Sequence, residues 1–233
     1  DKVEWQSFKK GFKSFLKLEK SLSENSVQAY IRDVEKLVQF LEMKSPSVSL
    51  LKAKPQDLRD FIKWITELGM LATTQARIIS GIKAFYKYLI LEDLLETDPS
   101  ALLETPKTRR KLPEVLSVHE INLLLDGLDL SKPENTRNKA MLEILYGSGL
   151  RVSELVNLKL SDLYLDLEFI KIKGKGNKER LVPVGSSALK YLQIYLDTVR
   201  NHLDIKKGHE DFIFLNKRGT KLSRVMIFMI IKD

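Results

Sequence analysis

The sequence predicts a mainly α-helical protein with a small β component, divided into two domains. Over about the first 90 residues, apolar side chains recur at spacings of three and four, which is the period of amphipathic helices. Alternation of apolar and polar side chains, the period of a β-strand, first occurs in residues 169–184. Between these regions, residues 104–113 hold two prolines and four basic side chains, which predict an extended basic linker.

Residues 1–103 are predicted to form a four-helix bundle. Each expected helix has an apolar stripe, and three of them begin at a capping residue or a proline. They cover residues 5–18, residues 25–41 after Ser23 or Asn25 as cap, residues 55–68 with Pro55 in the first turn, and residues 74–91 with Thr73 or Thr74 as cap. Four such stripes can bury one another, so a bundle follows.

Residues 114–233 are predicted to form a second, mixed α/β domain. Ser117 and Glu120 have the spacing of a capping box, which opens a helix. Further helices are expected over residues 136–146, 152–158 and 186–201, and after Ser223 as a cap. Strands are expected over residues 169–173, 180–184 and 211–215, with a turn at residues 174–177 joining the first two into a hairpin.

Charge and composition limit the classes of partner. Lys and Arg number 39 against 31 Asp and Glu, giving a net charge of +8, which suits an anionic partner without identifying one. The chain has no cysteine, so a disulfide framework and thiolate metal sites are excluded and a reducing, cytoplasmic location is expected. No apolar run reaches the roughly 18 residues that a membrane helix needs.

Arg151 is the first candidate for binding an anion. It follows two glycines at the start of an expected helix, where free backbone N–H groups and the helix dipole favour an anion. Glu154 lies three residues further on, adjacent on the helix surface, so that a contact between the two side chains can fix the guanidinium. The alternative is a surface ion pair after a glycine turn, which is common and contributes little stability.

The expected hairpin is the second candidate. Lys173, Lys175, Lys178 and Arg180 lie within eight residues around glycines that permit close backbone approach. A basic hairpin of this form can enter a groove or lie along phosphates, although lysines at a hairpin tip often serve only solubility. The presence of both segments in one chain disfavours both alternatives, the surface ion pair at Arg151 and the solubility role of the hairpin lysines.

Two segments resemble the tyrosine recombinases, the phage integrase family, and among them the Xer recombinases of bacteria. GSGLRVSELVNLKLSDL resembles their first catalytic box, and IKIKGKGNKERLVPV resembles their β-hairpin. Residues 1–103 resemble the SAM-like core-binding domain that clamps DNA, residues 102–117 the interdomain linker, and residues 211–224 the strand before the second catalytic box. The resemblance implies that residues 114–233 form a catalytic domain of the tyrosine recombinase type.

The resemblance also implies roles for single residues. Arg151 is implied to contact the non-bridging oxygens of the scissile phosphate, Glu154 to support it, and Lys175 to protonate the departing 5′-hydroxyl. Because a phosphotyrosyl intermediate conserves the energy of the phosphodiester bond, neither a metal nor another cofactor is expected. The residues expected to neutralise DNA phosphates are Lys107, Arg109, Arg110, Lys173, Lys178 and Arg180.

Other parts of the family pattern have no match in this sequence. The family supplies a His-x-x-Arg sequence, a further His or Trp, and a tyrosine nucleophile. None of His119, His202 and His209 has an arginine three positions later, and the seven tyrosines precede the place where the nucleophile belongs. We therefore expect a catalytic domain that is incomplete at its C-terminus, a nucleophile beyond Asp233, and no cleavage by the 233 residues alone.

The predicted function is site-specific cleavage and rejoining of duplex DNA through a 3′-phosphotyrosyl intermediate. The resemblance implies chromosome-dimer resolution or DNA integration, by a homo- or hetero-tetramer with a related recombinase on two DNA sites. A DNA translocase is the implied activator. The alternative is a protein of the same fold that binds DNA without cutting it. An unrelated helical adaptor is disfavoured, because it would explain neither the Arg151 segment nor the basic hairpin.

Overall fold

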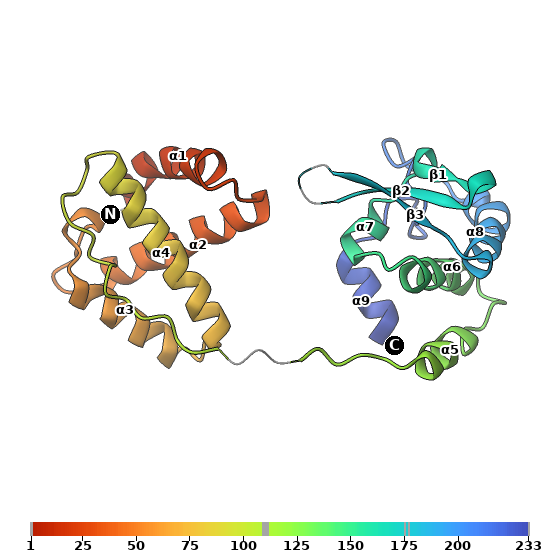
Figure 1. Ribbon diagram of the computed structural model, residues 1–233, viewed down its shortest axis with the longest axis horizontal. Helices are drawn as coiled ribbons and strands as arrows, with labels where there is room; N and C mark the ends of the chain where they lie inside the picture. Colours follow the sequence, from red (N-terminus) through yellow and green to blue (C-terminus); the bar gives the residue numbers. More distant parts are fainter. Residues whose placement is uncertain (1, 109–111, 175, 177, 233) are drawn as a thin grey trace. The chain divides into compact units, whose positions relative to one another are not determined.

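The computed structural model describes residues 2–108, 112–174, 176 and 178–232, with Lys2 and Val3 as backbone only. The chain divides into two compact units, Asp1–Leu112 and Pro113–Asp233. The predicted fold class, mainly helical with a small sheet, is confirmed. Helices of the first unit are α1 (Lys2–Leu18), α2 (Glu24–Met43), α3 (Pro55–Glu67) and α4 (Ala72–Leu91), with a 3₁₀ turn at Leu50–Lys52 (Figure 1).

Aromatic rings fill much of the core of the first unit. The ring of Phe85 on α4 meets those of Trp5 and Phe12 on α1 edge-on, with centroids 5.6 and 5.2 Å apart. Such edge-to-face pairs contribute stability beyond the apolar area that they bury. Buried apolar residues of α1, α2, α3 and α4 belong to one core cluster, so the apolar stripes of the four predicted helices meet as expected.

Helix starts in this unit agree with the predictions in two of three cases. Ser23 caps α2, accepting from the Ser26 N–H, and Pro55 opens α3. The prediction that Thr73 or Thr74 caps α4 is wrong, because both lie inside the helix, which begins after Leu71. The buried Gln75 instead ties this end to the preceding turn by donating to the carbonyl of Met70.

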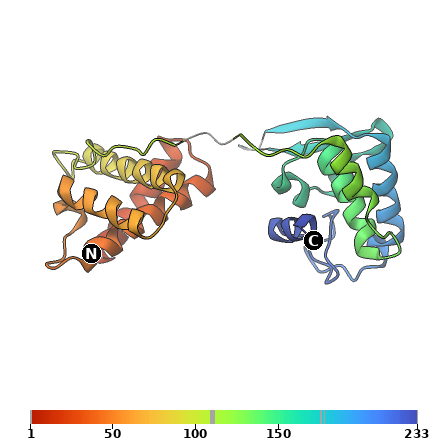
Figure 2. The ribbon, with the colours of Figure 1, turned by 90° about the horizontal axis from the view of Figure 1, so that it is seen from below.

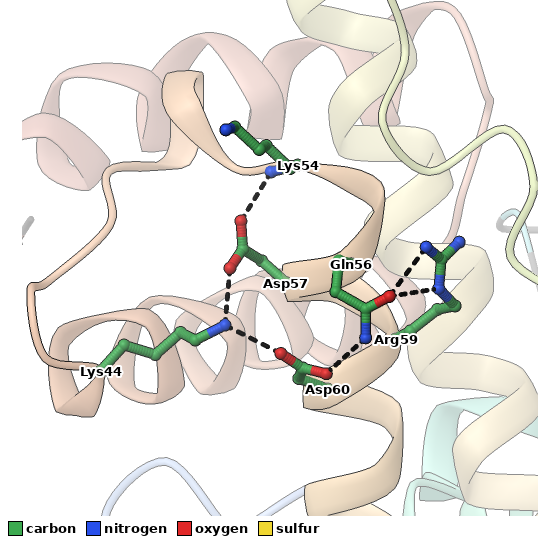
Figure 3. A network of polar contacts seen from close by, with 6 residues as sticks. All are labelled: Lys44, Lys54, Gln56, Asp57, Arg59 and Asp60. Atoms are coloured by element: carbon green, nitrogen blue, oxygen red, sulfur yellow. Dashed lines mark hydrogen bonds and ion pairs between the residues drawn. The ribbon is translucent and has the colours of Figure 1, made fainter.

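A polar network joins the end of α2 to the beginning of α3 (Figure 3). The Nζ of Lys44 lies 2.6 Å from Asp57 Oδ1 and 3.0 Å from Asp60 Oδ2. Asp57 Oδ2 also accepts from the Lys54 N–H at 2.8 Å, which satisfies a free donor at the start of α3. The residues at the two ends of the connection between α2 and α3, Lys44 and Lys54, are thus both bonded to carboxylates of α3.

Helices α2 and α4 contact each other closely at Gly81, where a Cβ atom would lie 3.3 Å from the Cβ of Asp33. Asp33 is fully buried, and its carboxylate pairs with Arg77 of α4. Burial raises the pKa of Asp33, and the hydrogen bond from Arg77 opposes that change. Because removing one partner would leave a buried charge unpaired, this contact is costly to disrupt.

The second unit has a three-stranded antiparallel sheet and five α-helices within its described residues. The strands, in the order β1-β2-β3, are β1 (Leu163–Tyr164), β2 (Phe169–Lys173) and β3 (Glu179–Pro183). The helices are α5 (Val118–Asp126), α6 (Pro133–Gly147), α7 (Val152–Val156), α8 (Ser186–Thr198) and α9 (Arg224–Lys232). Helices α6 and α8 pack side by side (Figures 1 and 2). No helix of the described chain is both long and apolar enough to span a membrane.

The predicted hairpin is confirmed, with β3 starting one residue earlier than expected. The predicted capping box is also present, since Ser117 and Glu120 bond each other's backbone N–H groups at 2.7 and 3.2 Å. The oxygen of Ser223 caps α9 by accepting from the Met226 N–H. The sequence prediction missed β1, because a two-residue strand is too short to show alternation.

The prediction of a strand over residues 211–215 is wrong. This segment makes only isolated bridges, Lys159 with Phe212 and Leu215 with Lys221. Three of its carbonyl groups bond side chains: Phe212 accepts from Arg200, Ile213 from Tyr195, and Leu215 from Arg137. The carbonyls of Asp211 and Phe214 accept from the backbone N–H groups of Leu160 and Leu222. Buried side chains thus satisfy much of the backbone in place of a ladder, which a local apolar pattern does not reveal.

Candidate nucleic-acid site

A glycine turn places Arg151 at the start of α7. Gly149 adopts a φ of +59°, in the left-handed region that favours glycine, and thereby ends α6. Leu150 and Leu155 are buried on either side of Arg151 and anchor the turn in the core. The side chain of Arg151 is 75% exposed, so its guanidinium is accessible to a ligand.

Glu154 lies beneath Arg151 and holds it at two points. Its Oε2 accepts from the Arg151 N–H at 2.8 Å, and its Oε1 accepts from Arg151 Nη1 at 3.2 Å. The predicted contact between these side chains is therefore present. Of the backbone N–H groups at this helix start, that of Arg151 is therefore bonded to the carboxylate of Glu154.

Arg180, on β3, is the second cation bound to this carboxylate. Its Nη1 and Nη2 donate to Glu154 Oε1 and Oε2 at 2.8 and 2.9 Å, forming a bidentate pair. These hydrogen bonds are the main reason that the pKa of Glu154 is lowered to about 2. The folded-state pKa of Glu154 lies below its usual value of 4.5. The ionised carboxylate and its bonds to Arg180 therefore stabilise the fold fully above about pH 4.5, and this stabilisation is lost as the pH falls toward 2.

Strand register explains how Arg180 reaches Glu154. Arg180 lies opposite Ile172 of β2, and directly opposed residues project from the same face of a sheet. Ile172 is buried, so this face points toward the core, where the side chain of Glu154 is only 4% exposed. The alternation in β3 already places Arg180 in phase with the partly buried Val182, a signal for an inward-facing arginine that the sequence analysis did not use.

The remaining predicted DNA-binding residues differ in their surroundings. Lys173 is about half exposed, and its Nζ lies 3.7 Å from Glu179 Oε1, in a surface pair of the kind that contributes little stability. Lys107 and Lys178 are exposed and have no ion-pair partner in the described part of the chain. Three predicted residues lie outside the described residues: Arg109, Arg110 and Lys175.

A basic, partly aromatic cleft adjoins Glu154 and was missed by sequence reasoning. Phe212 contributes its ring, over which the Nζ atoms of Lys159 and Lys221 lie 5.6 and 4.8 Å from the centroid. Lys221 also donates to Asn157 Oδ1, directly after α7, at 2.8 Å. Asn157 and Lys221 are 64 positions apart, so no local pattern indicates that they meet.

Several tyrosine and histidine side chains of the described residues form hydrogen bonds with the backbone. The buried Tyr86 and Tyr195 donate their hydroxyl protons to the carbonyls of Leu50 and Ile213, and burial raises the pKa of both. His209 Nδ1 accepts from the Lys221 N–H at 3.0 Å. No group of His, Cys, Asp and Glu among the residues that the structure covers could hold a metal ion.

Both units match the same family of proteins. Residues 114–233 match the model described as "Phage integrase family", and residues 10–93 match "Phage integrase, N-terminal SAM-like domain". The chain therefore belongs to the phage integrase family. Its relatives include "Tyrosine recombinase XerD" of Oceanobacillus iheyensis, 39% identical over 95% of this chain and 74% of that protein. The protein of the same name from Staphylococcus saprophyticus is 40% identical over 94% of this chain and 74% of its own length.

Solved structures show the same fold. A lambda integrase dimer bound to a COC′ core site has a TM-score of 0.70 at 16% identity, covering 97% of this chain and 80% of the other. XerH bound to a palindromic difH substrate in a post-cleavage complex has a TM-score of 0.69 at 22% identity, covering 88% and 62%. At these identities the likeness concerns the fold alone.

Proposed function

We propose that this protein is a site-specific DNA recombinase that cleaves and rejoins duplex DNA through a 3′-phosphotyrosyl intermediate. The observation that carries the proposal is the exposed guanidinium of Arg151, fixed by two contacts to a buried carboxylate. A cation held in this way needs little reorganisation when charge develops on a phosphate beside it. The match to the phage integrase family over both units supports the same conclusion.

In the proposed reaction a tyrosine hydroxyl attacks the scissile phosphorus, and a new Tyr–O–P bond forms as the bond to the 5′-oxygen breaks. Arg151 contacts the non-bridging oxygens, on which negative charge accumulates, and Glu154 keeps its guanidinium in place. Lys175 gives a proton to the departing 5′-oxygen. The reverse reaction, by a 5′-hydroxyl of another strand, rejoins the DNA and frees the tyrosine.

Binding of duplex DNA is proposed to rest on cations of the linker and hairpin, chiefly Lys107, Arg109, Arg110, Lys173 and Lys178. If five or six phosphates are neutralised, affinity is expected to fall on the order of 10³-fold between about 50 and 200 mM salt. Fluorescence anisotropy with a labelled duplex measures this. An affinity that changes less than about threefold over that range would contradict binding along the phosphate backbone.

The wider role is also part of the proposal. Two DNA sites and a tetramer of this or a related recombinase would be needed for exchange, in chromosome-dimer resolution or DNA integration. A lambda integrase tetramer bound to a Holliday junction has the same fold, which supports a tetrameric assembly here. A DNA translocase as activator and a cytoplasmic location complete the proposal.

Trapping on nicked suicide DNA tests the proposed reaction. In such a substrate the cleaved strand loses a short 5′-hydroxyl fragment, so rejoining fails and a covalent protein–DNA complex accumulates. We expect the recombinase that contains these 233 residues to form this complex. The 233 residues by themselves should bind but not cut, since they include no His-x-x-Arg sequence. DNA binding without any covalent complex by the recombinase would favour a non-cleaving DNA-binding protein instead.

A further inference from the structure

We propose that Arg180 is a positioning residue, which acts through Glu154 to hold Arg151 and the β2–β3 hairpin in one fixed arrangement. The inference rests on the proposed function, because it assigns Arg180 a task within the same cleavage site. It differs from the sequence-based expectation that Arg180 chiefly neutralises a DNA phosphate.

Hydrogen-bond geometry is the first argument. Each oxygen of the Glu154 carboxylate accepts two hydrogen bonds, one from Arg180 and one from Arg151. The two bonds from Arg180 are parallel and fork-shaped, so the carboxylate cannot rotate without breaking one of them. The orientation of the carboxylate, set by Arg180, thereby determines where the Arg151 guanidinium lies.

Charge balance is the second argument. Glu154 is ionised, and it lies between two guanidinium groups, so the three side chains together carry a net charge of +1. Without Arg180, Glu154 would pair with Arg151 alone, and that pair would carry no net charge. Arg180 therefore leaves the positive charge of Arg151 available to a phosphate, which a neutral pair would attract far less.

The position of Arg180 in the hairpin is the third argument. Gly174 directly follows β2, and its N–H bonds the carbonyl of Lys178 at 2.8 Å, closing the hairpin neck. A Cβ atom on Gly174 would lie 3.5 Å from Arg180 Nη1 and 3.8 Å from Glu154 Oε1, so this neck lies against the ion pair. The pair thus fastens the hairpin that carries Lys175 to the turn that carries Arg151.

Replacing Arg180 by methionine tests the inference, because Met keeps much of the side-chain length and removes the charged fork. Single-turnover cleavage of suicide DNA by the Arg180→Met recombinase, at saturating DNA, is expected to be about tenfold slower, as follows from misplacement of a reacting group. The dissociation constant for DNA and its salt dependence should stay within about twofold, since no phosphate contact is lost. Arg59→Met, which removes an exposed guanidinium of α3 that contacts Gln56, is the matched control and should cleave normally.

A double-mutant cycle separates positioning from a general effect on the fold. In Glu154→Gln, the negative charge and one of the two accepting oxygens are lost, so the two arginines are no longer joined by a forked pair, and adding Arg180→Met should change the cleavage rate by less than about twofold. Arg180→Lys, which keeps the charge but not the fork, should cleave at an intermediate rate. Thermal unfolding of each variant identifies any that is unfolded at the assay temperature, and the cycle is then measured at a lower temperature.

Three outcomes would overturn the role of Arg180 while the proposed function stands. These are normal cleavage by Arg180→Met, equal slowing by Arg180→Met with and without Glu154→Gln, and a loss confined to DNA affinity with the salt slope reduced by about one. The last would identify Arg180 as a phosphate contact. Absence of cleavage by the unmutated recombinase would overturn the proposed function instead, so the two failures are distinguishable.

Discussion

Arg151→Ala is expected to lower the rate of DNA cleavage by at least about 100-fold, or about 2.7 kcal/mol of transition-state stabilisation. Negative charge on the equatorial oxygens of the scissile phosphate grows as the tyrosine attacks, so a cation fixed beside them acts mainly in the transition state. The affinity for DNA should therefore change by less than about threefold, because other cations hold the duplex. Single-turnover cleavage and anisotropy on the same suicide duplex measure both quantities.

Arg151→Ala is expected to leave the core of the fold intact. Because its side chain is 75% exposed and its hydrogen-bond partner in the described part of the chain is Glu154, its loss opens no cavity in the core. Arg59→Ala removes an equally charged side chain from α3 and serves as the control for the loss of net charge. Near-normal cleavage by Arg151→Ala would exclude Arg151 from the chemistry and leave it as part of a surface ion pair.

Lys175→Ala is expected to slow cleavage of ordinary DNA by about 100-fold or more, which is the usual range for loss of a general acid. Its proposed task is to give a proton to the 5′-oxygen as the P–O bond breaks. A bridging sulfur at that position makes a leaving group that needs little protonation. On the sulfur-substituted duplex, Lys175→Ala should therefore cleave nearly as fast as the unmutated recombinase.

Arg151→Ala provides the contrast for this second prediction. It should remain slow on both duplexes, because charge on the non-bridging oxygens develops with either leaving atom. Rates are compared at saturating DNA, so that differences in affinity do not enter. Equal defects of Lys175→Ala on oxygen- and sulfur-containing DNA would reject the general-acid role and leave Lys175 as a phosphate contact.

Local sequence patterns predicted those parts of the fold that depend on neighbours along the chain. The capping box of Ser117 and Glu120 and the hairpin of β2 and β3 each follow from residues a few positions apart. The segment at residues 211–215 was predicted as a strand because its apolar pattern is local. Three of its carbonyls instead accept from the side chains of Arg200, Tyr195 and Arg137, and the last of these is 78 positions from Leu215.

In the candidate site, too, local patterns predicted contacts between near neighbours in the sequence but not those between distant residues. Arg151 and Glu154 are three positions apart, so helix geometry alone predicted their contact. Arg180 is 26 positions from Glu154, and its inward direction depends on the face of β3 that the core covers. The phase of Arg180 with Val182 indicated that face, but the basic surroundings of the hairpin favoured an outward, DNA-facing interpretation. The side chain of Arg180 is 41% exposed and bonds Glu154, as the alternation of the strand indicates.

Cleavage is proposed to proceed through a covalent bond between the DNA 3′-phosphate and a tyrosine of the recombinase. Peptide mass spectrometry of the complex trapped on suicide DNA tests this bond, because it identifies the modified side chain. We expect a nucleotide on a tyrosine other than the seven in this sequence, Tyr30, Tyr86, Tyr88, Tyr146, Tyr164, Tyr191 and Tyr195. A nucleotide on one of these seven, on a serine, or on no side chain at all would contradict it.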